Sequence, residues 1–263
     1  LRLVRVNQVL YIFNIQKLRR HEMIRLASIL AIAFCFVGGV GSATVHAEDA
    51  ANNTLTSKEK AEGWQLLFDG KSLAGWNSWR SKAALKEGAW KAIDGNLALT
   101  GRGGGDIYTA KSYKNYEFTV EWKTEGNSGI LLRVDPSSKG PIYGVAPESQ
   151  ILNDKPTSLS STSAGGLYAL YEMTVPKKKI NVKGWNHVRI SIVNNKGTHW
   201  FNGQKVVEYE IGSKEWKKRV GKSKFKKVVD KFGMTENGHI GFQDHGAKVM
   251  FRNVKIREIK AEK

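Results

Sequence analysis

The segment from Tyr116 to Trp122 alternates large apolar and polar side chains without a break. Side chains on a β-strand point alternately to the two faces of its sheet, so such a strand has one buried face and one polar face. Segments 188–192 and 240–243 repeat the pattern. Strands of this kind are typical of antiparallel sheets that face water on one side. The sequence therefore predicts an all-β protein.

Turn residues separate the predicted strands. Asp94-Gly95 lies between segments 89–93 and 96–100, and Asn202-Gly203 lies between segments 198–201 and 204–211. Both dipeptides tolerate the positive φ angles of two-residue hairpin loops. The last predicted strand, 249–259, changes phase at Asn253, which indicates a β-bulge. About a dozen short strands with close turns indicate a sandwich or a barrel.

The N-terminal part of the chain has a different pattern. Met23 and Arg25 precede an apolar run from Leu26 to Val40, which ends in glycines before Val45-His46-Ala47. This order is typical of a secretory signal peptide. We expect translation to start at Met23, so that residues 1–22 are an upstream mis-start. Cleavage after Ala47 would then leave a mature protein without residues 1–47. We expect this mature protein to be a bacterial protein exported to the periplasm or beyond. The mature protein would have no membrane span; the alternative is an uncleaved N-terminal anchor.

The remainder of the chain predicts a single domain. Residues 48–61 form a loose leader with a short helix, because Thr56-Ser57-Lys58-Glu59 has the pattern of a capping box. Residues 62–260 contain all the predicted strands. The one cysteine of the chain, Cys35, lies in the apolar run. A disulfide within the chain and a zinc site built on cysteines are therefore both excluded.

A basic stretch departs from the strand pattern. The chain has 42 Lys and Arg against 24 Asp and Glu, and lysines are concentrated in Lys214–Lys231. The apolar residues of this stretch predict one or two short amphipathic helices, broken at Gly221, with the basic side outward. We expect no nucleic-acid partner for an exported protein. The alternatives are a solubilising surface or a surface that binds an anionic envelope polymer or sulfated glycan.

Five sequence blocks together resemble one known family. They are Gly63-Trp64 with segment 67–73 and Gly75-Trp76; Glu121-Trp122-Lys123 with segment 127–130 and Arg133; segment 148–152 with Asp154; Gly184-Trp185-Asn186 with Asn202-Gly203; and segment 238–246 with segment 251–254. The chain resembles the 3-keto-disaccharide hydrolase domain family over residues 62–260. The resemblance implies a concanavalin A-like jelly-roll of two antiparallel sheets, with short helices in its connections, that acts on 3-keto-glycosides. Ala146-Pro147 departs from the family pattern, which has a Gly-aromatic pair there, and Leu167-Tyr168 is only a near match.

Side-chain parity places several polar residues opposite the core. Glu148 and Gln150 share one side of their predicted strand, and Ile240 and Phe242 leave Gln243 and His245 on the outer side. By the same argument Arg133 lies opposite Ile130 and Leu132. We therefore expect Arg133, Glu148, Gln150, Gln243 and His245 to surround one hollow. The structural alternative is that these are unrelated solvated residues.

The family resemblance implies a 3-keto sugar as the substrate, and the ketone of this sugar determines the reaction chemistry. The ketone acidifies the proton on C2, and its removal leads to expulsion of the glycosidic oxygen from C1, followed by addition of water. His245 or Glu148 would be the base, and Arg133 would polarise the ketone or bind hydroxyls. The resemblance adds substrate-binding residues, which are Glu121, Asn127, Gln150, Asp154, Tyr168 and Gln243. Asp154 and Gln150 either orient the sugar or ligate a divalent cation, and no other cofactor is expected.

Two other functions remain open from the residues. A non-catalytic glycan-binding module needs the same hollow without a base. An ordinary glycosidase needs two carboxylates about 5–9.5 Å apart. Glu117, Glu121 and Glu125 lie at four-residue steps, about 13 Å apart on one strand, and form no such pair alone. Glu121 can still meet a carboxylate from another strand, such as Glu148.

Overall fold

The computed structural model describes residues 51–153, 160–174 and 184–260 of the 263-residue chain. The predicted signal peptide, residues 1–47, and the predicted ligand Asp154 lie outside the described residues. All described residues belong to the unit Asp49–Lys263.

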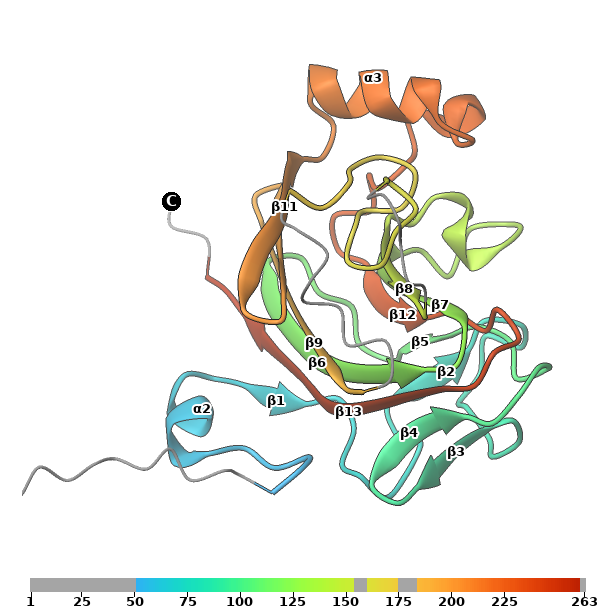
Figure 1. Ribbon diagram of the computed structural model, residues 1–263, viewed down its shortest axis with the longest axis vertical. Coiled ribbons are helices and arrows are strands. Elements are labelled where there is room, and N and C mark those ends of the chain that lie inside the picture. The colour runs from blue at the N-terminus through green and yellow to red at the C-terminus, as the bar shows by residue number, and fades with distance from the viewer. Residues whose placement is uncertain (1–50, 154–159, 175–183, 261–263) are drawn as a thin grey trace, which may run out of the picture. The chain divides into compact units, whose positions relative to one another are not determined.

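Thirteen strands in the described part of the chain form two antiparallel sheets, as Figure 1 shows. The eight-stranded sheet has the spatial order β11 (Gln204–Glu210), β10 (Lys196–Phe201), β9 (Asn186–Val193), β6 (Tyr116–Thr124), β13 (Val249–Glu258), β4 (Asn96–Leu99) and β3 (Trp90–Ile93), with β1 (Gln65–Leu66) paired to β13. The five-stranded sheet has the order β2 (Trp76–Ser78), β5 (Ile107–Thr109), β12 (His239–Phe242), β7 (Asn127–Val134) and β8 (Glu148–Leu152). This confirms the all-β sandwich predicted from alternation and resemblance.

The main core lies between the two sheets. Phe118, Val120 and Trp122 of β6 are buried in it, together with the alternate residues of β9. Ile240 and Phe242 of β12 contribute from the opposite sheet, as parity predicted. The Phe242 and Phe251 rings stack with centroids 3.8 Å apart and so join the two sheets directly.

The predicted turns and the predicted bulge are present. Asp94-Gly95 connects β3 to β4, and Asn202-Gly203 connects β10 to β11, with all four residues at positive φ. Asn253 has φ +51°, and the pairing of β13 with β6 shifts register between Arg252 and Lys255. The bulge in β13 is therefore confirmed at the predicted residue.

Short helices lie in the connections. The predicted capping box closes helix α2 (Ser57–Ala61), with Thr56 as its N-cap. Helix α3 (Lys214–Lys222) runs through Gly221 instead of breaking there, and a 3₁₀ turn, η3 (Lys226–Val228), follows it. A further 3₁₀ turn, η1 (Ile142–Gly144), precedes β8. None of the described helices has both the length and the apolar character that crossing a membrane requires.

The outer side of the five-stranded sheet is partly covered. Tyr108 on β5 and Leu131 and Val134 on β7 form a second apolar cluster there with Trp79 and Ile142. This sheet is therefore packed on both sides at one end. Next to the cluster, the same side of the sheet is polar, and the candidate site lies there.

Candidate active site

The candidate site lies on the outer side of the five-stranded sheet, where β8, β7 and β12 are neighbours. Glu148 on β8 pairs with Leu131 on β7, and Gln150 pairs with Gly129. Gln243, directly after β12, donates its backbone N–H to the carbonyl of Gly129 at 3.0 Å. Gly129 has no side chain, and the carboxyl group of Glu148 occupies the space that a Cβ on Gly129 would take.

Glu148, Gln150 and Gln243 line an open cavity of about 480 Å³. That volume lies within the ~300–1,000 Å³ range of small-molecule sites. Six of the residues proposed from sequence line it, namely Asn127, Glu148, Gln150, Tyr168, Gln243 and His245. The convergence predicted from parity and resemblance is therefore present for these six, although their chemical roles stay predictions.

The carboxyl group of Glu148 lies deep in this cavity. The residue is only 6% exposed, and its Oε1 lies where a Cβ on Gly129 would clash with it. Burial raises the pKa of Glu148 to about 7; the positive charge of Lys224 opposes this shift, and the negative charge of Asp106 reinforces it. A carboxyl group with a pKa near 7 exchanges protons readily at neutral pH, as general acid–base catalysis requires.

A second carboxyl group, Asp106, lines the same cavity. It lies directly before β5, and its Oδ1 accepts the backbone N–H of Asp244 at 2.9 Å. Burial raises the pKa of Asp106 to about 6, against the lowering effects of that hydrogen bond and of the charge on Arg80. Two carboxyl groups with raised pKa values in one cavity are typical of an acid–base site.

One side of the cavity is a glycine-rich loop held by a carboxylate. Asp244 Oδ2 accepts the backbone N–H groups of Gly103 and Gly105 at 3.1 and 2.8 Å, and its Oδ1 accepts that of Gly246 at 2.9 Å. The Trp90 indole also donates to the carbonyl of Gly105. Glycine-rich segments have much conformational freedom, and these contacts fix segment 101–105 as part of the cavity wall.

Two glutamine side chains that line the cavity each have a buried hydrogen-bond acceptor without a donor. Gln150 Nε2 donates to Asn127 Oδ1 at 3.1 Å, whereas Gln150 Oε1 and Gln243 Oε1 are buried without a partner. Gln150 and Gln243 are 3% and 6% exposed. Buried carbonyl oxygens are nearly always hydrogen-bonded, so these two require a donor from a bound molecule or from water. Sugar hydroxyl groups are donors of this kind.

Lys224 joins the cavity from the basic stretch. Its ammonium nitrogen lies 4.2 Å from the centre of the Tyr168 ring and 5.3 Å from that of Tyr143, and all three residues line the cavity. Trp79 lines it as well, and its indole N–H donates to the carbonyl of Gly140 at 3.1 Å.

Arg133 does not reach the cavity, and its predicted placement there is wrong. It has φ +55°, and the pairing of β12 with β7 shifts register between His239 and Gly241. This irregularity reverses side-chain parity at Arg133, because an irregular residue breaks the two-residue period of a strand. Its side chain is 2% exposed and donates to the Gly233 carbonyl and to Asn195 Oδ1. Arg133 therefore joins loops together rather than facing the substrate cavity.

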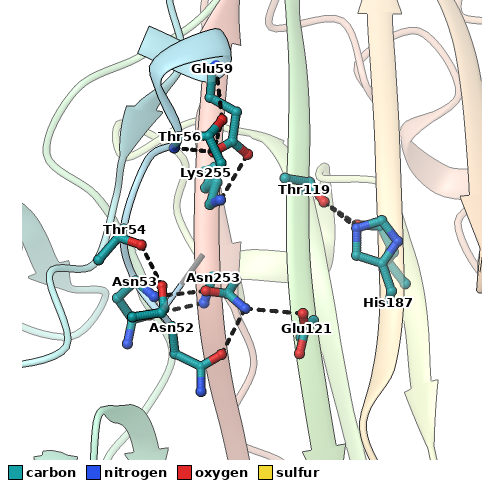
Figure 2. Close-up of polar contacts among 12 residues, drawn as sticks. Asn52, Asn53, Thr54, Thr56, Glu59, Thr119, Glu121, His187, Asn253 and Lys255 are labelled. Atoms are coloured by element: carbon teal, nitrogen blue, oxygen red, sulfur yellow. Dashed lines mark hydrogen bonds and ion pairs between the residues drawn. The ribbon is translucent and has the colours of Figure 1, made fainter. Parts of the chain in front are cut away.

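Glu121 is also elsewhere, on the outer side of the eight-stranded sheet. Figure 2 shows its carboxylate accepting a hydrogen bond from Asn253, at 3.0 Å. Arg252 donates to it as well, at 2.7 Å. The predicted substrate-binding position and the meeting with Glu148 are therefore wrong, because β6 and β8 belong to different sheets. His187, on the same side, contacts Thr119 (Figure 2).

The divalent cation suggested for Gln150 and Asp154 stays a prediction. Asp154 lies outside the described residues, and Gln150 donates its amide group to Asn127. Within the described ranges no group of three or more His, Cys, Asp or Glu side chains is placed to hold a metal ion.

Sequence reasoning missed Asp106 and Lys224. Asp106 follows Gly103-Gly104-Gly105, and this glycine cluster before a strand is the one local signal of a close backbone approach. Asp106 contacts Asp244, which lies 138 residues further along the chain, and neither segment has a sequence pattern that predicts this contact. Lys224 is one lysine among many in its stretch, so only the fold distinguishes it.

Comparison with known proteins shows the family of this chain. Residues 63–257 match the family of 3-keto-alpha-glucoside-1,2-lyase-like domains. A 3-keto-disaccharide hydrolase from Bacteroides thetaiotaomicron is 32% identical, with 79% of this chain and 82% of that relative aligned.

Two crystal structures from Parabacteroides distasonis ATCC 8503 that carry a glycosyl hydrolase assignment are similar to the chain. One is 33% identical with a TM-score of 0.70, covering 80% of this chain and all of that one. The other is 25% identical with a TM-score of 0.59, covering 74% and 99%. The chain therefore belongs to the family of 3-keto-alpha-glucoside-1,2-lyase-like domains and is a carbohydrate-active enzyme of the hydrolase type.

Proposed function

We propose that the protein cleaves 3-keto-glycosides, including 3-keto-disaccharides, by removing the proton on C2 of the oxidised sugar. The observation that carries the proposal is the Glu148 carboxyl group, which is buried, has a pKa raised to about 7 and still lines an open cavity. A base with this pKa is partly ionised at neutral pH and stronger than an exposed glutamate. The curated relative from Bacteroides thetaiotaomicron acts on substrates of this class.

The bond changes balance without an external reactant other than water. Glu148 takes the C2 proton, and the C2–H electron pair forms the enolate of the C3 ketone. The enolate re-forms the ketone as a C1–C2 double bond forms and the C1–O bond breaks. The leaving oxygen takes a proton from an acid, and water then adds to C1 as C2 is protonated. The net reaction is hydrolysis of the glycosidic bond.

Other cavity residues have roles that follow from their positions. Gln150 and Gln243 would accept hydrogen bonds from sugar hydroxyls through their unpaired carbonyl oxygens. The cations that line the cavity, Arg80, Arg102 and Lys224, would stabilise the enolate oxygen in place of Arg133. His245 is exposed at the cavity and would protonate the leaving group.

The pair of Glu148 and Asp106 supports a second candidate function. An ordinary glycosidase also uses two carboxyl groups as its catalytic residues, and its substrate needs no ketone. The two functions differ in what the substrate must contain. An unoxidised disaccharide has no acidic C2 proton, and only the two-carboxylate reaction can cleave it.

The full chain, incubated with a 3-keto-disaccharide and with its unoxidised parent, separates these functions. We expect sugar release from the keto form only, and loss of release in Glu148→Gln and in His245→Ala with the fold intact by circular dichroism. Equal release from both substrates would replace the proposal with the two-carboxylate reaction. Binding of the sugar without release from either would instead make the domain a glycan-binding module.

We also propose that the protein is exported. The support is the pattern of residues 23–47, with its basic start, apolar run and small-residue end. N-terminal sequencing of the protein recovered from the periplasm or culture medium of a bacterial host should begin at Glu48. A protein retained in the cytoplasm with residues 23–47 still attached would contradict this.

A further inference from the structure

The basic stretch is held on the molecule by its apolar side. Ser213 caps the N-terminus of α3, and Trp216 and Val220 of the helix are fully buried. The Trp216 indole donates to the carbonyl of Phe232 at 3.1 Å, and the Phe225 and Phe232 rings stack with centroids 4.2 Å apart. Figure 1 shows α3 outside the two sheets. The lysines of this stretch therefore extend from a well-anchored element.

Most of these lysines have no counter-charge in the protein. Glu215 pairs with Lys218 and Arg219, and Asp230 pairs with Lys217. Five others are exposed and have no carboxylate within 4.0 Å among the described residues; we call them the lysine surface, and they are Lys214, Lys222, Lys226, Lys227 and Lys231. Like charges concentrated in one short exposed stretch repel one another, so an anion with repeated charges would be attracted to them.

Lys224 links the lysine surface to the cavity. Lys224 lies in sequence between Lys222 and Lys226, and it lines the cavity together with Tyr143 and Tyr168. A chain-like ligand bound to Lys222 and Lys226 would therefore lie close to Lys224 and the cavity that it lines. Gln150 and Gln243, which line the cavity, each have a buried carbonyl oxygen without a donor, and such acceptors suit sugar hydroxyls rather than phosphates.

We propose that the lysine surface binds an anionic polysaccharide, carboxylated or sulfated, and that the bound chain leads to the catalytic cavity. The choice of a polysaccharide over a nucleic acid rests on the proposed function, because the adjoining cavity is then a sugar site. Binding to the surface itself does not require turnover. The ammonium groups supply repeated charge contacts, and such contacts weaken steeply as salt rises.

The test measures binding of the full chain to polygalacturonate, to heparin and to neutral dextran over a range of sodium chloride concentrations. The variant replaces Lys222, Lys226, Lys227 and Lys231 with glutamine. The matched control replaces four exposed lysines outside the stretch that also lack a carboxylate partner, Lys71, Lys91, Lys123 and Lys196. Both variants lose the same net charge, so only the position of the lysines differs.

We expect tight binding of at least one acidic polymer and none of dextran. The Kd for the acidic polymer should rise on the order of tenfold or more in the lysine-surface variant and less than about twofold in the control. The Kd of the lysine-surface variant should also depend less steeply on salt concentration than that of the wild type. Absence of acidic-polymer binding at low salt, or equal weakening in both variants, would overturn the proposal. Equally tight binding of a single-stranded oligonucleotide would also overturn it. Failure to cleave 3-keto-disaccharides with polymer binding retained would sink the proposed function alone.

Discussion

The carboxyl group of Glu148 fits into the site because its neighbour on β7 is Gly129. A Cβ added to Gly129 would lie 2.7 Å from Glu148 Cδ and closer still to Oε1. Gly129→Ala should therefore displace the Glu148 side chain from its Cγ outward, because the added Cβ would also lie 2.7 Å from that atom. A displacement of this size should lower kcat/KM by about 100-fold.

Steady-state kinetics on a 3-keto-disaccharide, together with a thermal melt, tests this prediction. Gly88→Ala is the matched control, because a Cβ there meets nothing within 4 Å. Unchanged kinetics in Gly129→Ala would show that the position of the Glu148 carboxyl group does not matter to the reaction.

The raised pKa of Glu148 also predicts how stability depends on pH. Its ordinary pKa is 4.5 and its folded-state pKa is about 7, so between these values the folded protein binds more protons than the unfolded chain. The stabilising effect of the protonated side chain is therefore complete below about pH 4.5 and is lost as pH rises through 7. A shift of this size corresponds to about 3 kcal/mol.

Glu148→Gln removes this dependence because glutamine stays neutral. We expect the variant to gain up to about 3 kcal/mol in free energy of unfolding over the wild type at pH 8.5, and far less at pH 4.5. Urea denaturation at both pH values measures the difference. The control is Glu125→Gln, whose side chain is 69% exposed. A variant less stable than the wild type at pH 8.5 would contradict the buried, titrating carboxyl group.

At the scale of elements, Asp244 connects the end of β12 to the glycine-rich loop before β5. Its carboxylate accepts three backbone N–H groups, and charged hydrogen bonds contribute about 1.5–3 kcal/mol each. Asp244→Ala should release the loop. We expect faster hydrogen exchange at the amides of Gly103 and Gly105 and a KM higher by on the order of tenfold.

Asp69→Ala is the control for this prediction. Asp69 also accepts two backbone N–H groups in an exposed turn, but it does not line the cavity. Its loss should leave KM and the exchange of the 101–105 amides unchanged. Slow exchange at Gly103 and Gly105 in Asp244→Ala would show that other contacts hold the loop.

The elements also show where sequence reasoning succeeds. Strict alternation placed Glu148 and Gln150 correctly, because β8 is regular over its five residues. The bulge at Asn253 was predictable because the apolar pattern itself changes phase there. At Arg133 the pattern of β7 gives no warning, since almost every residue of that strand is buried on one side or the other. The irregularity arises from pairing with β12, which is a long-range property.

At the scale of the molecule, the carboxylates on the outer sides of the two sheets differ in whether they have positively charged partners. Glu117 and Glu121 on the eight-stranded sheet are neutralised by arginines. Within the described part of the chain, no Lys, Arg or His nitrogen lies within 4.0 Å of a carboxylate oxygen of Glu148 or Asp106. The sequence shows all four as acidic residues near strands. Only the three-dimensional structure distinguishes the acidic residues that stabilise the fold through ion pairs from the acidic residues that could act in a reaction.

This difference predicts opposite effects of one substitution at the two surfaces. Glu117 is 5% exposed and pairs with Arg189 and Arg257, which stack on Trp200 and Trp64. Glu117→Gln removes the carboxylate that pairs with Arg189 and leaves Arg257 with only Glu62, 3.4 Å away, as a counter-charge. It should lower the free energy of unfolding on the order of 2 kcal/mol, between the values for exposed and buried pairs, with kcat unchanged.

Denaturation curves and kinetics of Glu117→Gln and Glu148→Gln, measured side by side at pH 8.5, test this contrast. The first variant should be less stable and active, and the second more stable and inactive. Loss of activity in folded Glu117→Gln would mean that the eight-stranded sheet also contributes to the reaction.

The central claim is that proton removal from C2, inside the cavity that holds Glu148, precedes cleavage of the glycosidic bond. The most direct measurement is the hydrogen isotope at C2 of the sugar released from a 3-keto-disaccharide in heavy water, read by NMR at early times against an enzyme-free sample. The account predicts deuterium at C2 of the released sugar, with release abolished in Glu148→Gln. Release of a sugar that keeps its original C2 proton would contradict it, because the bond would then break without passing through the enolate.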